Sequence, residues 1–383
     1  MHFTRLVLTN WRNFPSAEVE LGMRTYVIGP NASGKSNLLG VFRFLRTIAQ
    51  PDGGGLQQAV KQWGGMKGIR SLHARRNSQV RIEVEVRDGR GDDQTTWRYV
   101  LALESEAKEQ RVRVAEEIVE RNGKPVIAPR PSREDSNDPE RLTQTYLEQI
   151  SVNQPFRELA NFLAGTTYLH LVPQLLKHAE EIGGNILTQD PFGQSLMHRI
   201  AATPKKVRDA RLRRIEKTLK PAIPLFSKLE FNQDRITGKW HLEANFSHWR
   251  PRGAWQREDQ LSDGTLRLFG LLWALHEGHD LLLLEEPELS LNDDIVARIP
   301  WLIDRIMRNQ KKDREIIIST HSQTLLHHVS DATVLIIEPG KDGSTIRPPS
   351  KDETDQMERG LTPAEVLFPK IRPEKIDQLG LFE

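Results

Sequence analysis

An eight-residue segment, Gly29–Ser36, has residue types and spacing suited to binding phosphate groups. It reads GPNASGKS and fits the pattern G-x-x-x-x-G-K-S/T. Its glycines let the backbone curl so that N–H groups point inward at phosphate oxygens. Lys35 is expected to reach the β- and γ-phosphates of a nucleotide, and the Ser36 hydroxyl to ligate Mg²⁺. The residues predicted to contact the nucleotide here are Asn31, Ala32, Ser33, Gly34, Lys35, Ser36 and Asn37.

The elements on either side are those that a phosphate-binding loop requires. An apolar run, residues 26–28, precedes the segment and predicts a strand, while residues 35–48 have the apolar spacing of a helix. A helix start adds a positive dipole and unpaired N–H groups to the loop. A chance glycine-rich turn is disfavoured, because the complete pattern lies between a strand and a helix.

Two acids follow a second apolar run. Leu281–Leu284 predicts a buried parallel strand, and Glu285 and Glu286 come directly after it. Carboxylates at the C-terminal end of such a strand are well placed for metal and phosphate chemistry. Glu285 is predicted to hold Mg²⁺ directly or through water, and Glu286 to orient and deprotonate the attacking water. Alone, this pattern would equally suit the end of a buried helix, and the phosphate loop favours the site.

Two further segments have both a chemical and a structural interpretation. Ser262 and Gly264 stand at the start of an apolar helix, Leu266–Leu275, and form either an anion site or an ordinary helix cap. His321 follows an apolar strand that begins at Ile316. It either hydrogen-bonds a γ-phosphate or is a structural histidine.

The order of these motifs removes much of that ambiguity, because it resembles the ABC-type ATPase heads of the SMC, RecF and OLD group, which are AAA-family ATPases. The resemblance implies that Leu261–Gly264 is the signature motif and that Glu285 and Glu286 end the Walker B strand. It also implies that His321 is the switch histidine. ATP and Mg²⁺ are the cofactors implied, and Glu286 and His321 the catalytic residues.

The segment Asn10–Phe14, NWRNF, resembles the N-F-R-x-F element that precedes the phosphate loop in this group, which implies that Arg12 lies near the nucleotide. The acids and the residues after them look most like the OLD and RecF-like branch, but the chain after His321 is too short for a typical Toprim nuclease domain. Asn292 stands at the D-loop position, where Asp is usual. The Q-loop glutamine is not assigned, since Gln79, Gln149 and Gln154 all compete for the role.

Composition excludes several classes of protein. The chain has 383 residues, of which 37% are hydrophobic and 28% charged, so a soluble globular protein is expected. It has no cysteine, which excludes disulfides, thiolate zinc sites and cysteine nucleophiles and favours a cytoplasmic location. No apolar run is long enough to span a membrane, and the start of the chain does not resemble a signal peptide.

The expected fold is α/β: a P-loop NTPase of the ABC-type ATPase head class, with an N-terminal antiparallel β-subdomain and a helical insertion. Strict alternation in residues 80–86 indicates a half-buried strand of that subdomain. Residues 125–139 are interpreted as a linker and residues 140–163 as helical. The predicted domains are an N-lobe with the phosphate loop (1–125), a linker and helical insertion (126–225), a C-lobe with signature, Walker B and switch histidine (226–340), and a tail (341–383).

Three surface features have open interpretations. Lys205–Lys220 holds eight Lys or Arg and two acids, and either tracks a nucleic-acid backbone or forms a solvated helix face. Trp249–Arg257 interleaves aromatic residues and cations; it either binds nucleic acid or a partner or, the favoured interpretation, packs at a dimer interface. In the tail, residues 366–368 and 379–382 are short apolar anchors that either dock a partner or, slightly favoured, fold back on the head.

The function expected from these features is Mg²⁺-dependent ATP binding and hydrolysis by a head-to-tail homodimer. Ser262 and Gly264 of one subunit would complete the site at Lys35 of the other. Its output would be a DNA-repair or anti-phage defence process, acting through DNA or a separately encoded effector such as a nuclease. The alternatives are a transporter ATPase subunit, which the long interval between Ser36 and Ser262 opposes, and a nucleotide-gated scaffold with very slow hydrolysis.

The chain itself is expected not to be a nuclease. Nuclease chemistry usually needs clustered carboxylates that hold one or two metal ions. Outside the ATPase motifs the acidic pairs are Asp92-Asp93, Glu134-Asp135 and Asp293-Asp294. Each pair is interpreted as a solvated turn or a helix cap.

Overall fold

The computed structural model describes residues 1–74, 79–89, 94–105, 111–178, 192–249, 253–278, 280–309 and 313–372. The chain divides into two compact units, each assembled from segments that are distant in the sequence. The first comprises residues 1–167, 279–283 and 312–383, and the second residues 168–278 and 284–311. The four consecutive domains expected from the sequence stay a prediction.

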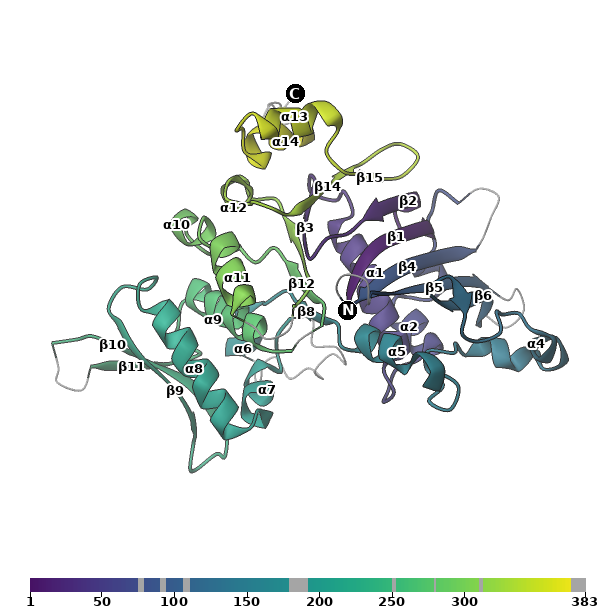
Figure 1. Ribbon diagram of the computed structural model, residues 1–383. Helices are drawn as coiled ribbons and strands as arrows, with labels where there is room; N and C mark the ends of the chain where they lie inside the picture. Colours follow the sequence, from purple (N-terminus) through teal and green to yellow (C-terminus); the bar gives the residue numbers. More distant parts are fainter. Residues whose placement is uncertain are drawn as a thin grey trace, which may run out of the picture. The chain divides into compact units, whose positions relative to one another are not determined.

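The first unit contains an antiparallel sheet with strand order β2-β1-β4-β5-β6-β7 (Figure 1). Its strands are β1 (His2–Trp11), β2 (Phe14–Glu20), β4 (Val80–Asp88), β5 (Thr95–Ser105), β6 (Val112–Arg121) and β7 (Lys124–Pro125). Apolar and polar residues alternate along them, so that Val84 and Val86 of β4 are buried on one face. The predicted antiparallel N-terminal sheet is confirmed.

Helix α1 (Lys35–Ala49) provides much of the core of this unit. The Phe42 ring lies 4.8 Å from that of Phe3 on β1, and the Phe44 ring 5.3 Å from that of Trp11. The short helices α2 (Leu56–Gln62) and α3 (Met66–Ile69) follow α1. Because aromatic pairs such as these bury large areas, they fix α1, and with it the end of the phosphate loop, against β1.

A second sheet has strand order β15-β14-β3-β13-β12-β8. Its strands are β3 (Arg24–Ile28), β8 (Thr167–Leu169), β12 (Leu282–Glu285), β13 (Ile316–Thr320), β14 (Thr333–Glu338) and β15 (Thr345–Arg347). Strand β3 pairs in parallel with β13 and β14, and Ile28 lies opposite Thr320. The phosphate loop and His321 therefore leave the sheet from neighbouring points at the same edge.

The second unit is mainly helical, with a three-stranded antiparallel sheet of order β11-β10-β9. Its elements are α6 (Pro173–Lys177), α7 (Leu196–Ala202), α8 (Lys205–Leu219), β9 (Phe226–Gln233), β10 (Trp240–Phe246), β11 (Ala254–Arg257), α9 (Asp263–His276), α10 (Asp293–Val296) and α11 (Ile299–Arg308). Helix α8 packs against β9 (Figure 1). For residues 174–220 the sequence predicts helices broken at Gly183-Gly184 and at Pro204. The helices and the break at Pro204 are confirmed, while Gly183-Gly184 lies outside the described residues.

The tail folds back on the first unit up to residue 371. Helices α12 (Gln323–His327), α13 (Lys351–Glu358) and α14 (Pro363–Ile371) pack together near its end (Figure 1). Val366 and Leu367 are buried, and His327 shares a hydrogen bond of 2.8 Å with the Thr362 hydroxyl. The second apolar anchor, residues 379–382, lies outside the described residues.

The interpretation of residues 125–139 as a linker is wrong. Arg130 and Asp135 are buried and joined by an ion pair of 2.8 Å, next to the buried carboxylate of Glu117. Burial raises the pKa of Glu117 to about 7, although the Tyr146 N–H group donates to it. Asp135 does cap helix α4 (Arg133–Asn137), but it is buried rather than solvated. The composition of the segment does not reveal this burial, because it depends on Glu117 and on the Gln144 carbonyl, which accepts from Arg130.

Residues 140–163 are also less helical than expected. They form two short 3-10 helices, η2 (Pro139–Thr143) and η3 (Gln154–Phe156), before α5 (Arg157–Ala164). Pro155 cannot donate to a helix ladder, and the buried Asn153 amide donates instead to the Leu147 carbonyl at 2.8 Å. In the described part of the chain, no helix has both the length and the apolar composition needed to cross a bilayer.

Candidate functional site

The phosphate loop has the curled backbone that its glycines predict. Ala32 and Gly34 adopt φ angles of 63° and 112°, and Gly34 immediately precedes α1. A Cβ atom on Gly34 would lie only 2.0 Å from the Asn13 amide nitrogen, so glycine is required by space as well as by φ. The loop therefore packs tightly against Asn13 of the NWRNF segment.

Side-chain hydrogen bonds hold the loop from outside. The Ser33 carbonyl accepts from the Asn13 amide and from the Ser344 hydroxyl, each at 2.7 Å. The Asn37 amide donates to Asn13 Oδ1 at 2.7 Å, and the Trp11 indole donates to the Asn37 carbonyl at 2.8 Å. Asn13 and Ser344 were missed in the sequence analysis. The NWRNF segment was the available signal for Asn13, whereas nothing local distinguishes Ser344.

Lys35 and Ser33 point polar atoms into the loop. The Lys35 side chain is largely buried, and its Nζ donates to the carbonyls of Gly29 at 2.9 Å and Pro30 at 3.1 Å. Ser33 Oγ is buried and has no hydrogen-bond partner among the described residues. A compact ammonium and a ring of inward N–H groups suit the β- and γ-phosphates of a nucleotide. The side chains of the loop are therefore suited to binding the phosphate groups of a nucleotide.

Arg12, which was predicted to lie near the nucleotide, contacts Trp63 in this structure. Its backbone is left-handed, with φ of 50°, and its guanidinium carbon lies 5.2 Å from the centroid of the Trp63 ring. Burial lowers the Arg12 pKa. The described contact is thus a cation–π interaction with Trp63, and a contact of Arg12 with a nucleotide stays a prediction.

His321 and the phosphate loop line one pocket of about 620 Å³. Gly29, Pro30 and Asn31 form one part of its wall, and His321 with Gln323 another. The remaining lining comes from helix α14 and the residue after it: Phe368, Pro369, Ile371 and Arg372. The parallel register of β3 and β13 brings the loop and His321 together. The contribution of the C-terminal helix was not foreseen, because nothing in its sequence points to a site.

None of the three candidate Q-loop glutamines lines this pocket. The Gln79 amide donates to Glu104 at 3.2 Å, and the Gln149 amide to the Thr145 carbonyl at 3.1 Å. Gln154 begins the 3-10 helix η3. The position of the Q-loop glutamine is therefore still unassigned.

The acidic segment belongs to the second unit. The Tyr168 hydroxyl donates to Glu285 Oε2 at 2.5 Å, and His170 Nδ1 lies 3.2 Å from the Glu285 carbonyl. The Tyr168 hydroxyl thus orients the carboxylate that is predicted to hold Mg²⁺, while His170 contacts the backbone of the same residue. Tyr168 and His170 were missed in the sequence analysis; Tyr168 lies in β8, and His170 directly follows that strand.

Glu286 has an unusual backbone. Its φ of 45° places it in the left-handed region, which is rare and costs energy for a residue with a side chain. Its negative charge acts on Arg267: burial lowers the Arg267 pKa, and the charges of Asp263, Glu286 and Glu288 oppose that effect. Strained backbone of this kind is found preferentially at functional sites.

The signature segment acts as a helix cap. The Ser262 hydroxyl is exposed and accepts the Thr265 N–H at 3.2 Å, so it caps α9. A Cβ atom on Gly264 would lie 2.6 Å from the Ser290 carbonyl, so the start of α9 approaches the Glu286–Asn292 turn closely. Asn292 caps α10 by accepting the Ile295 N–H at 2.9 Å. The cap interpretation of Ser262 is confirmed, and its anion-binding role stays a prediction.

The comparison with known protein families assigns the chain. Residues 24–327 match the family described as "AAA domain, putative AbiEii toxin, Type IV TA system". The chain belongs to this family. The matched region contains the phosphate loop, the signature segment, both acids and His321. The chain is thus an ATP-binding ATPase of the AAA family.

Among solved structures, SMC head domains have the same fold. The chain is similar to an SMC head bound to the C-terminal winged-helix domain of ScpA, with 14% identity, a TM-score of 0.53 and coverage of 93% of this chain and 100% of that one. It is also similar to an SMC head with an extended coiled coil from Pyrococcus furiosus, with 12% identity, a TM-score of 0.55 and coverage of 94% and 98%. The predicted ATPase head fold is confirmed.

A curated transporter protein matches part of the chain. It is the L-cystine import ATP-binding protein TcyN of Bacillus subtilis, which is 29% identical over 116 residues. The match covers 29% of this chain and 44% of that protein. The chain thus spans less than half of the length of this relative. The match supports ancestry shared with ABC ATPases, while the OLD and RecF-like branch stays a prediction.

Proposed function

We propose that the chain is a Mg²⁺-dependent ATPase that dimerises head to tail around two ATP molecules and drives a DNA-repair or anti-phage defence process. The observation that carries the proposal is the pocket lined by both the phosphate loop and His321. A histidine at the mouth of a phosphate loop is placed to hydrogen-bond a terminal phosphate and to respond to its loss.

Each residue has a stated role in hydrolysis. Lys35 compensates the charge of the β- and γ-phosphates, and Ser36 and Glu285 are the residues that would hold Mg²⁺. The bound metal supplies charge neutralisation at the phosphates. Glu286 accepts the proton of the attacking water, and His321 donates a hydrogen bond to the γ-phosphate. The Tyr168 hydroxyl keeps the Glu285 carboxylate in one orientation.

The dimer is proposed because the signature segment presents groups that its own subunit uses only in part. Ser262 is exposed at the start of α9, where N–H groups and the helix dipole favour an anion. In the proposed dimer it contacts the γ-phosphate bound by Lys35 of the partner. Trp249 and Trp255 are 82% and 43% exposed and are proposed to lie in the same interface.

The output of the ATPase is proposed to pass through DNA or a separately encoded effector such as a nuclease. The family description names a toxin of a Type IV toxin–antitoxin system, which supports a role in defence rather than a general cellular function. ATP would bias a two-state dimer geometry that the partner reads.

A transporter subunit is the second candidate, because the TcyN match favours it. The discriminating observation is what co-purifies with the chain: a membrane permease, DNA or a soluble effector. A nucleotide-gated scaffold with very slow turnover is the third, since Asn292 replaces the usual Asp at the D-loop position.

The decisive experiment is the Glu286→Gln variant. Loss of the general base should slow hydrolysis by about 10²–10⁴-fold while ATP still binds, so that an ATP-bound dimer accumulates in size-exclusion chromatography. Asp294→Asn is the matched control, because it removes an exposed carboxylate from the neighbouring helix α10. Full turnover by Glu286→Gln would show that another group is the base.

A mixing experiment tests the composite site. Ser262→Arg should block dimerisation and turnover while sparing ATP binding, and Lys35→Ala should not bind ATP. A mixed dimer of the two variants retains one site with neither defect, so mixing should restore part of the activity. No recovery, under conditions where mixed dimers are shown to form, would overturn the head-to-tail arrangement.

A further inference from the structure

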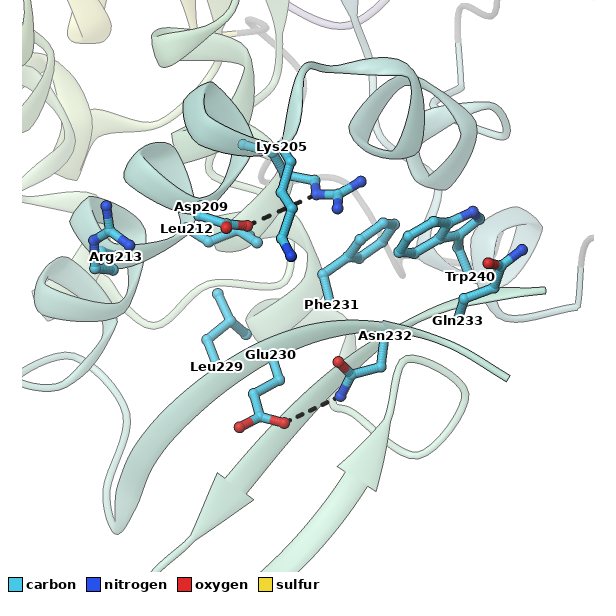
Figure 2. Close-up of a pocket in the computed structure, with 11 residues that line it drawn as sticks. Lys205, Asp209, Leu212, Arg213, Leu229, Glu230, Phe231, Asn232, Gln233 and Trp240 are labelled. Atoms are coloured by element: carbon cyan, nitrogen blue, oxygen red, sulfur yellow. Dashed lines mark hydrogen bonds and ion pairs between the residues drawn. The ribbon is translucent and has the colours of Figure 1, made fainter. Parts of the chain in front are cut away.

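The second unit contains a pocket of about 480 Å³ between helix α8 and strands β9 and β10 (Figure 2). Its helix wall carries Lys205, Arg208 and Arg213. Its strand wall carries the aromatic pair Phe231 and Trp240. In Figure 2, Lys205 extends from α8 toward these rings. The volume lies within the range of about 300–1,000 Å³ that is usual for ligand pockets.

Arg208 is the unusual member of this pocket, because its charge is buried without full compensation. The residue is 8% exposed. Its Nη1 donates to the Ala201 carbonyl at 3.3 Å, but its buried Nε has no hydrogen-bond partner among the described residues. The nearest carboxylate, Asp209, lies 3.9 Å away. A buried guanidinium with so few partners gains from a charged hydrogen bond to an anion.

The two acids in the pocket do not neutralise its cations. Glu230 is already paired with Lys228 at 2.5 Å and accepts the Asn232 amide at 3.0 Å. Asp209 is the remaining carboxylate, beside Arg208. No ion pair joins Lys205 or Arg213 to another residue in the described ranges. The pocket therefore has a net positive charge.

The opposite wall favours a ligand with flat rings. The Phe231 and Trp240 rings are stacked, with centroids 5.1 Å apart and planes 8° apart. The Arg208 guanidinium carbon lies 4.7 Å from the Trp240 centroid and 5.4 Å from that of Phe231. Guanidinium planes and aromatic side chains are the groups on which nucleobases stack. An acidic peptide would use the cations but not this wall.

We propose that this pocket binds a backbone phosphate and an adjacent base of a single nucleic-acid strand. Lys205 and Arg213 stand eight residues apart, about 12 Å along α8, which is long enough to follow more than one nucleotide of a strand. This proposal gives a binding site for the DNA partner named in the proposed function. Only the biological role of that binding rests on the proposed function. Its test uses equilibrium binding without ATP, so its failure would leave ATP hydrolysis untouched.

The test compares two double variants that remove the same charge from the same helix. Lys205→Ala/Arg213→Ala changes two exposed residues of the pocket. Lys206→Ala/Lys217→Ala changes two exposed residues of α8 outside it. Binding of a labelled single-stranded DNA or RNA of about 20 nucleotides is measured by fluorescence anisotropy at low and moderate salt. Thermal unfolding checks that each variant is folded.

The expected result is a loss of roughly tenfold or more in affinity for the pocket variant and less than about threefold for the control. Equal losses in both variants, or no binding by the unmodified chain, would overturn the proposal. Competition separates the sources of the ligand: inorganic phosphate or a mononucleotide that displaces the strand at micromolar concentration would point to a free small anion. Polyglutamate binding with the same dependence on the two variants would point to an acidic peptide, and either outcome would overturn the nucleic-acid assignment.

Discussion

The phosphate loop and the Glu286–Asn292 turn both follow buried strands, yet they are constrained very differently. Three side chains, Asn13, Ser344 and Asn37, hydrogen-bond the loop or its support. The turn is closed by backbone bonds, such as that from the Leu289 N–H to the Glu286 carbonyl at 3.2 Å. A loop that must present N–H groups to phosphate gains from being ordered in advance. The turn that carries the proposed catalytic acid has strained φ angles at Glu286 and Ser290 instead.

The largest effect should come from the lysine of the loop. Lys35→Ala removes the charge that compensates the phosphates and should lower ATP affinity by at least about 10²-fold, since charged hydrogen bonds contribute about 1.5–3 kcal/mol each. Isothermal titration calorimetry measures this, with Lys61→Ala on the exposed side of α2 as the control. Unchanged affinity for ATP in Lys35→Ala would remove the basis of the phosphate-loop assignment.

A smaller effect is expected when the loop loses its external support. Asn13→Ala removes the hydrogen bonds to the Ser33 carbonyl and from the Asn37 amide, leaving Lys35 in place. ATP affinity should fall by roughly fivefold to tenfold, because about 1 kcal/mol of the binding free energy is then spent on ordering the loop. Calorimetry with a non-hydrolysable ATP analogue measures binding without turnover. An affinity equal to that of the unmodified chain would mean that the loop is ordered without Asn13.

The acidic segment should respond in rate rather than in binding. Tyr168→Phe removes the hydroxyl that donates to Glu285. We expect kcat to fall by about threefold to fivefold and the Mg²⁺ requirement to rise, with ATP affinity measured without metal unchanged. A steady-state assay over a range of Mg²⁺ concentrations checks this. A change in metal-free ATP affinity would contradict the separate roles given to the two regions.

The smallest effect is expected at the cap of α10. Asn292→Ala removes the acceptor for the Ile295 N–H and should cost about 1 kcal/mol in the free energy of unfolding. ATP affinity should change by less than about twofold, in contrast to the matched change at Asn13. Urea unfolding and calorimetry on the same preparation give both values. A larger loss of ATP affinity in Asn292→Ala than in Asn13→Ala would contradict the claim that the loop, and not the turn, is ordered for ATP binding.

Much of the site was predictable because its motifs are local. The phosphate loop needs eight consecutive residues and a helix start, and α1 begins at Lys35 as expected. The alternation in residues 80–86 and the apolar run before Glu285 likewise predicted β4 and β12. Periodicity and turn residues depend on the local environment of the backbone, and this local information was sufficient to predict these elements.

Other parts depend on residues that meet across the chain. Ser344 reaches the Ser33 carbonyl from more than 300 positions away, and Arg372 lines the pocket of the phosphate loop. Arg130, in the predicted linker, is buried against the Glu117 carboxylate of β6 and donates to the Gln144 carbonyl, each more than ten positions away. A short window of sequence does not contain both partners of such contacts.

The sequence by itself determined the chemistry: a phosphate loop, two acids after a strand, and a histidine after another strand, in an order typical of ATPase heads. The tertiary structure decided which of these groups share a pocket. The parallel register of β3 and β13, with Ile28 opposite Thr320, joins the loop to His321. The packing of α8 on β9 likewise turned a basic helix into one wall of a pocket. Residue types follow from composition and spacing, whereas proximity follows from strand register and helix packing, which involve the whole chain.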